Sequence, residues 1–122
     1  MKALVVDDSE TTRRILVRSL VKAEILSCDE AADGREAITA CLNNEYDVVL
    51  MDWNMPNMSG LDAVKAIRSA GKQVPIIMVT TESEKARVVD AIKAGANNYI
   101  CKPFQPDVLA AKIKETLLKA DT

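Results

Sequence analysis

The stretch DVVLMDWNMPNMSG, residues 47–60, decides the fold. It opens with the apolar run Val48–Met51, which has the length of a strand. A continuous apolar run fits a strand that is buried on both faces, as in a parallel sheet. Asp52 ends this run, and turn and cap residues follow it as far as Ser59 and Gly60. In open α/β sheets the ligand crevice lies outside the carboxyl ends of the strands, so we predict that Asp52 is the reacting residue.

The rest of the chain repeats the pattern of an apolar strand followed by an amphipathic helix. Apolar runs predict four more strands, at Ala3–Val6, Ile25–Cys28, Val74–Val79 and Asn98–Cys101. Residues typical of helix starts precede or open the helical segments, namely Ser9, Asp33, Ser59 and Pro106. Five strands that alternate with five helices predict a parallel sheet with helices on both faces, because parallel strands need right-handed crossovers.

Helical spacing of apolar residues predicts which face of each helix is buried. The predicted core faces are, in chain order, Thr12, Ile15, Leu16, Ser19, Leu20 and Ala23, then Ala37, Ile38, Cys41 and Leu42, then Leu61, Val64 and Ile67, then Val88, Val89 and Ile92, and last Leu109, Ala110, Ile113 and Leu117. Arg13 falls on the predicted outer side of the first helix. Gly95 is the predicted C-terminal cap of the fourth helix.

Length and composition indicate one globular domain. A chain of 122 residues with 48% hydrophobic and 28% charged residues is typical of a single domain, taken as residues 1–122. The net charge of −2 favours neither nucleic acid nor an anionic membrane as a partner. Acids directly follow the short apolar run at the N-terminus, so we expect no signal peptide and no membrane insertion, and the predicted location is cytoplasmic.

The histidine and cysteine content narrows the chemistry. The chain has no histidine, which excludes Ser–His and Cys–His nucleophilic machinery and histidine-bound zinc or iron. Cys28, Cys41 and Cys101 are widely spaced among apolar residues, and we predict that they are reduced core residues. Any chemistry must therefore use carboxylates, amines, hydroxyls or the backbone.

Charged and hydroxyl side chains follow four of the predicted strands. The first strand ends in Asp7 and Asp8, the third in Asp52, the fourth in Thr80 and the fifth in Lys102. In a parallel sheet these ends meet at one edge, and clustered carboxylates require compensating positive charge. Lys102 supplies one charge. Mg²⁺ fits the rest, because it takes one or two carboxylates and keeps several waters.

Each of these residues also has a purely structural interpretation. Asp8, Ser9 and Thr80 fit helix caps, and Lys102 fits a solvated surface lysine. Tyr99 fits a plain core residue as well as a ring that moves at the surface. The convergence of four strand ends with complementary chemistry favours a site over capping alone.

The strand-end residues, together with MPNMSG at residues 55–60, resemble the receiver domain of two-component response regulators. The resemblance extends over essentially the whole chain. It implies a flavodoxin-like, doubly wound α/β fold with a five-stranded parallel sheet of order 2-1-3-4-5. It also implies a phosphoacceptor signalling protein that catalyses only its own phosphorylation and dephosphorylation.

The resemblance implies a role for each matching residue. Asp52 is the implied phosphoacceptor, Lys102 is the implied partner of the phosphoryl oxygens, and Thr80 with Tyr99 is the implied switch pair. The implied Mg²⁺ ligands are Asp7, Asp8, Asp52 and the backbone carbonyl of Asn54. The positions implied to modulate the phosphorylation rates are Asn54, Thr81 and Glu82. The resemblance also implies a cis peptide bond between Lys102 and Pro103, which the local sequence allows.

The residues Trp53, Asn54 and Glu82 resemble the pattern of the CheY-like chemotaxis group of stand-alone receivers. The implied partners are a CheA-like sensor histidine kinase, a downstream target such as the flagellar motor switch protein, and a phosphatase. The face made by the fourth helix, the fifth strand and the fifth helix is the implied binding surface. We expect no output domain after Thr122.

Two alternatives from other classes stay open. One is a phosphorelay intermediate that passes its phosphoryl group to a histidine phosphotransfer protein. The other is an aspartate-nucleophile phosphatase, although such enzymes carry a second acid two residues after the nucleophile, where this chain has Asn54. A flavin-binding protein of the same architecture is disfavoured, because no phosphate-binding loop rich in Ser, Thr or Gly follows the first strand.

Overall fold

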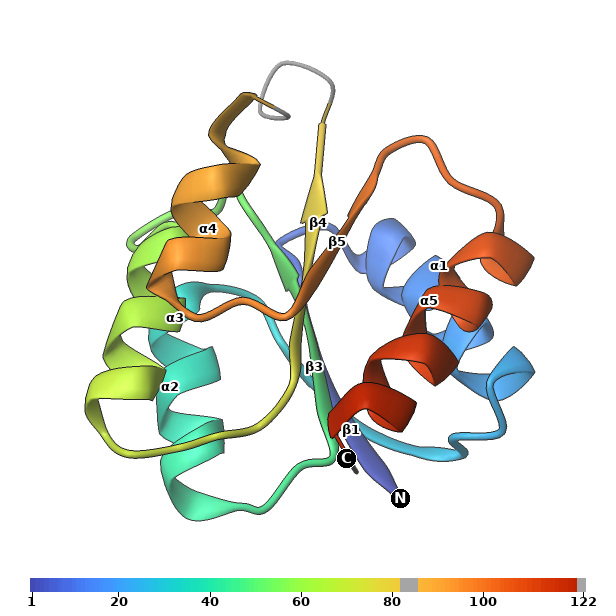
Figure 1. The fold of residues 1–122 in the computed structure, drawn as a ribbon, viewed down its shortest axis with the longest axis horizontal. Helices are drawn as coiled ribbons and strands as arrows, with labels where there is room; N and C mark the ends of the chain where they lie inside the picture. The colour runs from blue at the N-terminus through green and yellow to red at the C-terminus, as the bar shows by residue number, and fades with distance from the viewer. Residues whose placement is uncertain (82–85, 121–122) are drawn as a thin grey trace.

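Five parallel strands form the centre of the computed structural model, which describes residues 1–81 and 86–120. The strands are β1 (Lys2–Val6), β2 (Ser27–Ala31), β3 (Val48–Asp52), β4 (Ile76–Thr80) and β5 (Asn98–Cys101). Each neighbouring pair is parallel, and the order is β2-β1-β3-β4-β5, which confirms the predicted fold class and strand order (Figure 1). Glu82 and Thr122, which carry two of the sequence-based predictions, lie outside the described residues.

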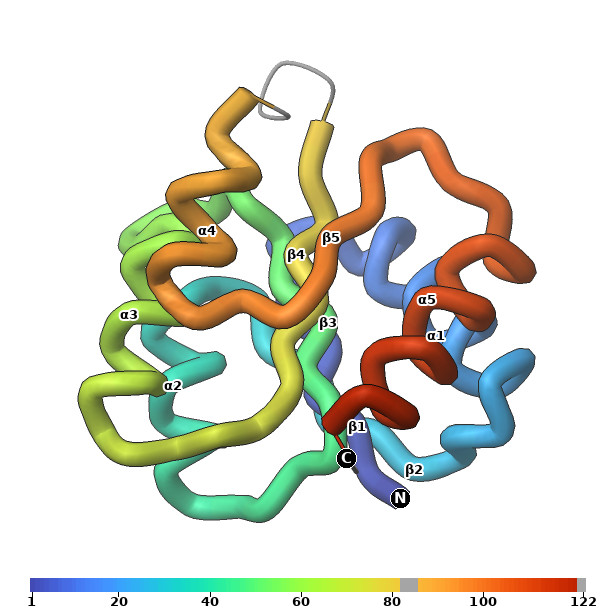
Figure 2. The backbone as a smooth tube through the Cα atoms, viewed as in Figure 1, coloured from blue at the N-terminus to red at the C-terminus, as the bar shows by residue number. Residues whose placement is uncertain are grey.

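The helices form one layer on each side of this sheet. They are α1 (Glu10–Lys22), α2 (Gly34–Asn43), α3 (Gly60–Ser69), α4 (Val88–Ala94) and α5 (Pro106–Ala120). In Figure 1, α1 and α5 cover one face, and α2, α3 and α4 cover the other. The backbone trace in Figure 2 shows the chain crossing to the second face after α1 and returning for α5, as expected for a doubly wound sheet.

Three helices begin at the caps that the sequence predicts. The side chains of Ser9, Asp33 and Ser59 each accept a hydrogen bond from the backbone N–H three residues further on, at 3.2, 2.9 and 3.2 Å respectively. These bonds satisfy N–H groups that have no partner within the helix. Pro106 is the first residue of α5, and Gly95 caps α4 with a left-handed φ of 118°.

Strand alternation divides the buried residues into two cores. One core lies between the sheet and α2, α3 and α4, and its strand residues include Leu4, Val6, Val49, Met51, Ile76 and Met78. The other lies between the sheet and α1 and α5, and its strand residues include Ala3, Val5, Val48, Leu50, Ile77, Val79 and Ile100. Because successive side chains of a strand point to opposite faces, this alternation also determines the face on which the residue at each strand end lies.

Two strands begin later than the sequence predicts. β2 starts at Ser27, because the apolar pair before it belongs to the turn after α1: Glu24 takes a left-handed φ of 67°, and the N–H of Ile25 donates to the Leu20 carbonyl at 2.9 Å. β4 starts at Ile76, whose N–H donates to the Asn97 side chain at 2.9 Å. Residues 74 and 75 therefore precede β4 rather than open it.

Three predicted core residues are exposed instead. Leu42 on α2 is 51% exposed, and on α4 Val89 and Ile92 are 61% and 45% exposed. The short helix α4 contacts α3 and is buried only at Ala91, with Val88 half-buried. The predictions for Leu42, Val89 and Ile92 are therefore wrong, while the predicted faces of α3 and of α5 are confirmed at Leu61, Val64, Ile67, Leu109, Ala110 and Ile113.

Burial of the cysteine thiols agrees with the sequence prediction. Cys41 is buried and Cys28 is half-buried, and burial raises the pKa of both thiols, which fits reduced core cysteines. Among residues 1–81 and 86–120, no helix combines the length and the apolar character that crossing a lipid bilayer requires.

Candidate functional site

Strand alternation directs three charged side chains to the same side of the carboxyl edge of the sheet. Asp7, Asp52 and Lys102 each lie two residues after a residue of the core beneath α1 and α5, namely Val5, Leu50 and Ile100. Residues two apart on a strand point to the same face. The strand register aligns the carboxyl ends of neighbouring strands, because Val6 pairs with Met51 and Asp52 pairs with Val79. The residues at these ends therefore lie along one edge of the sheet.

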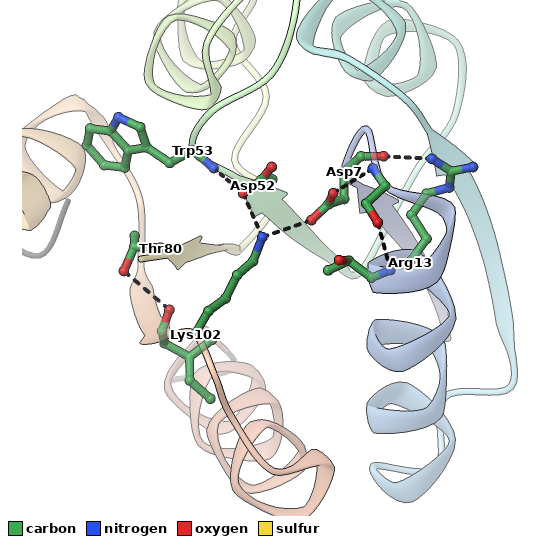
Figure 3. A network of polar contacts seen from close by, with 9 residues as sticks. Asp7, Arg13, Asp52, Trp53, Thr80 and Lys102 are labelled. Carbon is green, nitrogen blue, oxygen red and sulfur yellow. Dashed lines mark hydrogen bonds and ion pairs between the residues drawn. The ribbon is translucent and has the colours of Figure 1, made fainter. Parts of the chain in front are cut away.

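The three side chains meet at this edge (Figure 3). Nζ of Lys102 lies 3.2 Å from Oδ1 of Asp52 and 3.3 Å from Oδ2 of Asp7. Carboxylate oxygens of Asp7, Asp8 and Asp52 all lie within 4.8 Å of one another. Asp7 and Asp52 are buried, whereas Asp8 is exposed. The structure thus brings together the acids and the lysine that the sequence placed at separate strand ends.

One ammonium does not neutralise this cluster. Burial and the neighbouring Asp7 raise the pKa of Asp52 to about 6, although Lys102 and the N–H of Trp53 oppose that rise. Burial works to lower the pKa of Lys102, but Asp52 and Asp7 outweigh it and hold that pKa above its ordinary value. Negative charge is therefore in excess, and hard oxygen donors are the ligands that Mg²⁺ prefers, so the residues fit a bound Mg²⁺.

Asp7 is fixed through four of its atoms. Its N–H donates to the Ala31 carbonyl at 3.1 Å, and its Oδ1 accepts from the N–H of Ser9 at 2.8 Å. Its Oδ2 accepts from Lys102, and its backbone carbonyl accepts from Nη1 of Arg13 at 2.7 Å (Figure 3). The carboxylate is consequently held in place before any ligand arrives.

Sequence reasoning missed Arg13. The helical pattern placed it on the outer side of α1, but its side chain is only 18% exposed. Nε of Arg13 pairs with Oε1 of Glu30 on β2 at 2.8 Å while Nη1 reaches Asp7. The signal that would have found it is its place one turn into the helix that follows the acidic pair, where a long side chain reaches back to the strand end.

Thr80 and Tyr99 lie on the other face of the sheet. Thr80 is fully buried, and its hydroxyl donates to the Ile100 carbonyl at 3.4 Å. Tyr99 pairs with Met78, two residues before Thr80, and packs against the core beneath α2, α3 and α4. The ring of Tyr99 is half-buried, and Nζ of Lys112 lies over it, 5.0 Å from the ring centroid.

The residues around Asp52 differ in exposure. The N–H of Trp53 donates to Oδ1 of Asp52 at 2.9 Å, and the indole is buried with Arg87 at 5.0 Å over its ring. Asn54 is exposed and Thr81 is half-buried. The peptide bond before Pro103 is cis, as the sequence resemblance implies.

A hollow opens on the α1 side of Lys102. Its volume is about 390 Å³, and it is lined by Thr12, Ile15, Lys102, Pro103 and Phe104. Its lining is mostly apolar and includes one cationic side chain, Lys102, which also contacts Asp52.

Known proteins share both the sequence and the fold. The family model described as the response regulator receiver domain matches residues 3–114. The chain is 48% identical to chemotaxis protein CheY1 of Helicobacter pylori, over 96% of this chain and 97% of that protein. It is 46% identical to the chemotaxis protein CheY homolog of Campylobacter jejuni, over 96% and 92% respectively.

Solved structures give the same result. The chemotaxis protein CheY4 of Vibrio cholerae superimposes with a TM-score of 0.85 at 36% identity, covering 94% of this chain and 97% of that one. The receiver domain of the Francisella response regulator 1452 superimposes with a TM-score of 0.87 at 27% identity, covering 98% of both chains.

The fold and the site define a doubly wound α/β protein with clustered carboxylates at the carboxyl edge of a parallel sheet. The chain belongs to the family of response regulator receiver domains. It is a phosphorylation-activated switch of two-component signalling, and the similarity favours this function over a phosphorelay intermediate or a phosphatase.

Proposed function

We propose that Asp52 is the phosphoacceptor of this receiver and that its phosphorylation switches binding of a chemotaxis partner. The observation that carries the proposal is the position of Asp52: it is buried at a strand end, 3.2 Å from Nζ of Lys102 and next to two further acids. A carboxylate is a competent nucleophile for a phosphoryl group.

The transfer is an exchange of one bond to phosphorus. A carboxylate oxygen of Asp52 attacks the phosphorus of a phosphohistidine, and the bond from phosphorus to the imidazole nitrogen breaks, with its electron pair leaving on that nitrogen. Because the chain has no histidine, the donor belongs to another molecule, and a CheA-like sensor histidine kinase fits that role. Lys102 stabilises the charge on the transferred oxygens.

The chain's own oxygen donors would hold Mg²⁺ beside the acceptor. The proposed ligands are the carboxylates of Asp7, Asp8 and Asp52 and the backbone carbonyl of Asn54, and the three carboxylates already lie within 4.8 Å of one another. When bound, Mg²⁺ neutralises charge that develops on the phosphoryl oxygens. We assign rate modulation to Asn54, Thr81 and Glu82, which flank the acceptor or follow β4.

The switch would run through the opposite face of the sheet. Thr80 ends β4 and faces the same core as Tyr99 on the neighbouring strand β5. A phosphoryl group adds charge and hydrogen-bond acceptors at Asp52, which Thr80 can approach if its hydroxyl leaves the Ile100 carbonyl. Tyr99 then moves into the vacated space, and the surface of α4, β5 and α5 shifts toward its binding form.

Chemotaxis is the pathway that the relatives favour. The proteins that are 46% to 48% identical over nearly the whole chain carry that name. The proposed target is the flagellar motor switch protein, with a phosphatase as a further partner. The proposed unit is a single receiver domain, residues 1–122, located in the cytoplasm.

The first prediction tests the acceptor. Acetyl phosphate with Mg²⁺ should add one phosphoryl group to the protein, and Asp52→Asn should abolish this uptake because the variant lacks the nucleophilic oxygen. Intact-mass spectrometry measures the product. Asp47→Asn is the matched control, since Asp47 is exposed just before the opposite end of β3 and the variant should phosphorylate normally. Persistent phosphorylation of Asp52→Asn at another residue would contradict the assignment.

A further inference from the structure

The least expected contact near the acidic cluster is made by Arg13. Its guanidinium donates to the Asp7 carbonyl at 2.7 Å (Figure 3). It also pairs with Glu30 at 2.8 Å, so Arg13 ties α1 to the end of β1 and to β2. Both bonds are of the strong, charge-assisted kind, and the two use different nitrogens of one rigid plane. Most of the Arg13 side chain is covered and its bond to the Asp7 carbonyl is partly buried, so solvent competes weakly for that donor, whereas the pair with Glu30 is exposed.

The carbonyl that Arg13 holds belongs to the peptide joining Asp7 to Asp8. That peptide's orientation sets the direction in which both carboxylates leave the backbone. The other bonds of Asp7 fix its N–H and its carboxylate oxygens but not this carbonyl. Groups that orient metal ligands without touching the metal commonly change affinity by about 10- to 100-fold when removed.

We propose that Arg13 is a positioning residue of the acidic cluster, which holds the Asp7–Asp8 peptide so that both carboxylates face a bound Mg²⁺. This inference rests on the proposed function, because it assumes that the cluster takes up Mg²⁺. Arg13 acts through the backbone of Asp7 and does not contact the metal. Glu30 keeps the guanidinium plane aligned with the carbonyl.

The sign of the effect separates positioning from plain electrostatics. Arg13 carries positive charge close to carboxylates, so losing only its charge would make the cluster more negative and would tighten Mg²⁺ binding. Losing its positioning would weaken binding instead. A purely structural role would lower the free energy of unfolding without changing Mg²⁺ affinity.

The second prediction uses three variants of the full chain. The Mg²⁺ dissociation constant is measured by calorimetry and by fluorescence of Trp53, which directly follows Asp52. Arg13→Met should raise the constant by about tenfold, and Arg13→Lys, which keeps the charge but not the planar pair of donors, should raise it several-fold. Arg14→Met is the matched control, because Arg14 pairs with Glu10 in an exposed contact and should bind as the wild type does.

Phosphorylation by acetyl phosphate adds a kinetic test. The half-saturating Mg²⁺ concentration should rise for the Arg13 variants, while the rate at saturating Mg²⁺ stays within about threefold of the wild type, since metal binding restores the orientation. Unchanged or tighter Mg²⁺ binding in Arg13→Lys overturns the inference. If Arg13→Met does not fold, the dissociation constant of Arg13→Lys alone tests the inference. If the wild type binds Mg²⁺ and neither Arg13 variant changes the dissociation constant, the inference about Arg13 is wrong but the proposed function is unaffected. No Mg²⁺ binding by the wild type overturns both.

Discussion

At the scale of single residues, Asp52 is held in a destabilising state. Its pKa of about 6 lies above the ordinary value of 3.8, so the folded protein binds a proton in a range where the unfolded chain has lost it. The free energy of unfolding therefore falls as the pH rises from about 4 to about 6, because the stabilising proton on Asp52 is lost over this range. Above about pH 6 Asp52 makes no further pH-dependent change to the free energy of unfolding. The ionised carboxylate of Asp52, the proposed acceptor, opposes folding until a cation or a phosphoryl group changes its surroundings.

The third prediction follows from this sign. In metal-free buffer, Asp52→Asn should be more stable than the wild type by about 1–3 kcal/mol above pH 6, with the difference shrinking toward pH 4. Urea unfolding at several pH values with a chelator present measures it. Asp47→Asn removes one negative charge from an exposed position outside the cluster and gives the reference against which the Asp52→Asn difference is compared. A difference that stays constant from pH 4 to pH 7 would contradict the raised pKa.

Residues at strand ends were predictable, and long side chains that reach across elements were not. Asp7, Asp52 and Lys102 could be placed together because their backbone positions alone bring them to one edge. Arg13 could not, because helical periodicity fixes the direction of Cβ but not the destination of a guanidinium at the end of a flexible stem. The raised pKa of Asp52 likewise depends on burial, which a strand pattern only suggests.

At the scale of elements, the junction of β3 and α3 controls the shape of the site. The N–H of Gly60 donates to the Trp53 carbonyl at 2.8 Å, so the first residue of α3 closes back on the end of β3. A Cβ atom at position 60 would lie 2.1 Å from the Asp52 carbonyl oxygen, far inside contact distance. The glycine of the MPNMSG segment is therefore required for close approach of the backbone.

The fourth prediction tests this junction. Gly60→Ala should lower the free energy of unfolding by about 2–4 kcal/mol and slow phosphorylation by acetyl phosphate about tenfold or more, because the backbone of Asp52 must move. Urea unfolding and the phosphorylation rate measure the two effects.

Gly71→Ala is the control for the junction variant. Gly71 has a φ of 82° but open space around it, so alanine there should lose only about 1–2 kcal/mol and leave phosphorylation unchanged. Equal effects of both substitutions on the phosphorylation rate would rule out the role given to Gly60.

The order and type of the elements followed from the sequence more reliably than their limits. β3 is buried on both sides, so an unbroken apolar run marked it, whereas β2 pairs with β1 alone and has polar residues along its length. The apolar pair before β2 belongs to a turn, which a pattern of apolar residues does not distinguish from a strand. In α4, the predicted stripe took Val89 and Ile92 as buried, but the buried residue of this helix is the small Ala91.

At the scale of the whole molecule, the charged edge and the proposed switch residue Tyr99 belong to opposite faces of the sheet. The core beneath α1 and α5 ends at the charged edge, with Asp7, Asp52 and Lys102, while the core beneath α2, α3 and α4 includes Tyr99. Strand order could be predicted only through the resemblance to receiver domains, because crossover rules allow several orders. The placement of the charged edge and of Tyr99 on opposite faces follows from strand register, which the sequence does not give.

The incorrectly predicted residues of α4 now carry the last prediction. Val89 and Ile92 are large apolar side chains exposed on the helix that borders β5, and exposed apolar residues at a proposed partner surface are candidates for direct contact. In the presence of Mg²⁺ and beryllofluoride, which mimics the phosphoryl group, Val89→Lys should weaken binding of the purified flagellar motor switch protein by about tenfold. Stability should change by less than about 0.5 kcal/mol, because the position is exposed.

Leu42→Lys is the control for Val89→Lys. It shows whether weaker binding comes from the α4 surface itself or from the loss of any exposed apolar side chain. Leu42 is 51% exposed on α2, away from α4 and β5, and its replacement should leave partner binding unchanged. Both variants should take up one phosphoryl group normally, since neither residue lies at the charged edge. Equal weakening by Val89→Lys and Leu42→Lys, or normal binding by Val89→Lys, would place the partner elsewhere on the molecule while leaving the acceptor site intact.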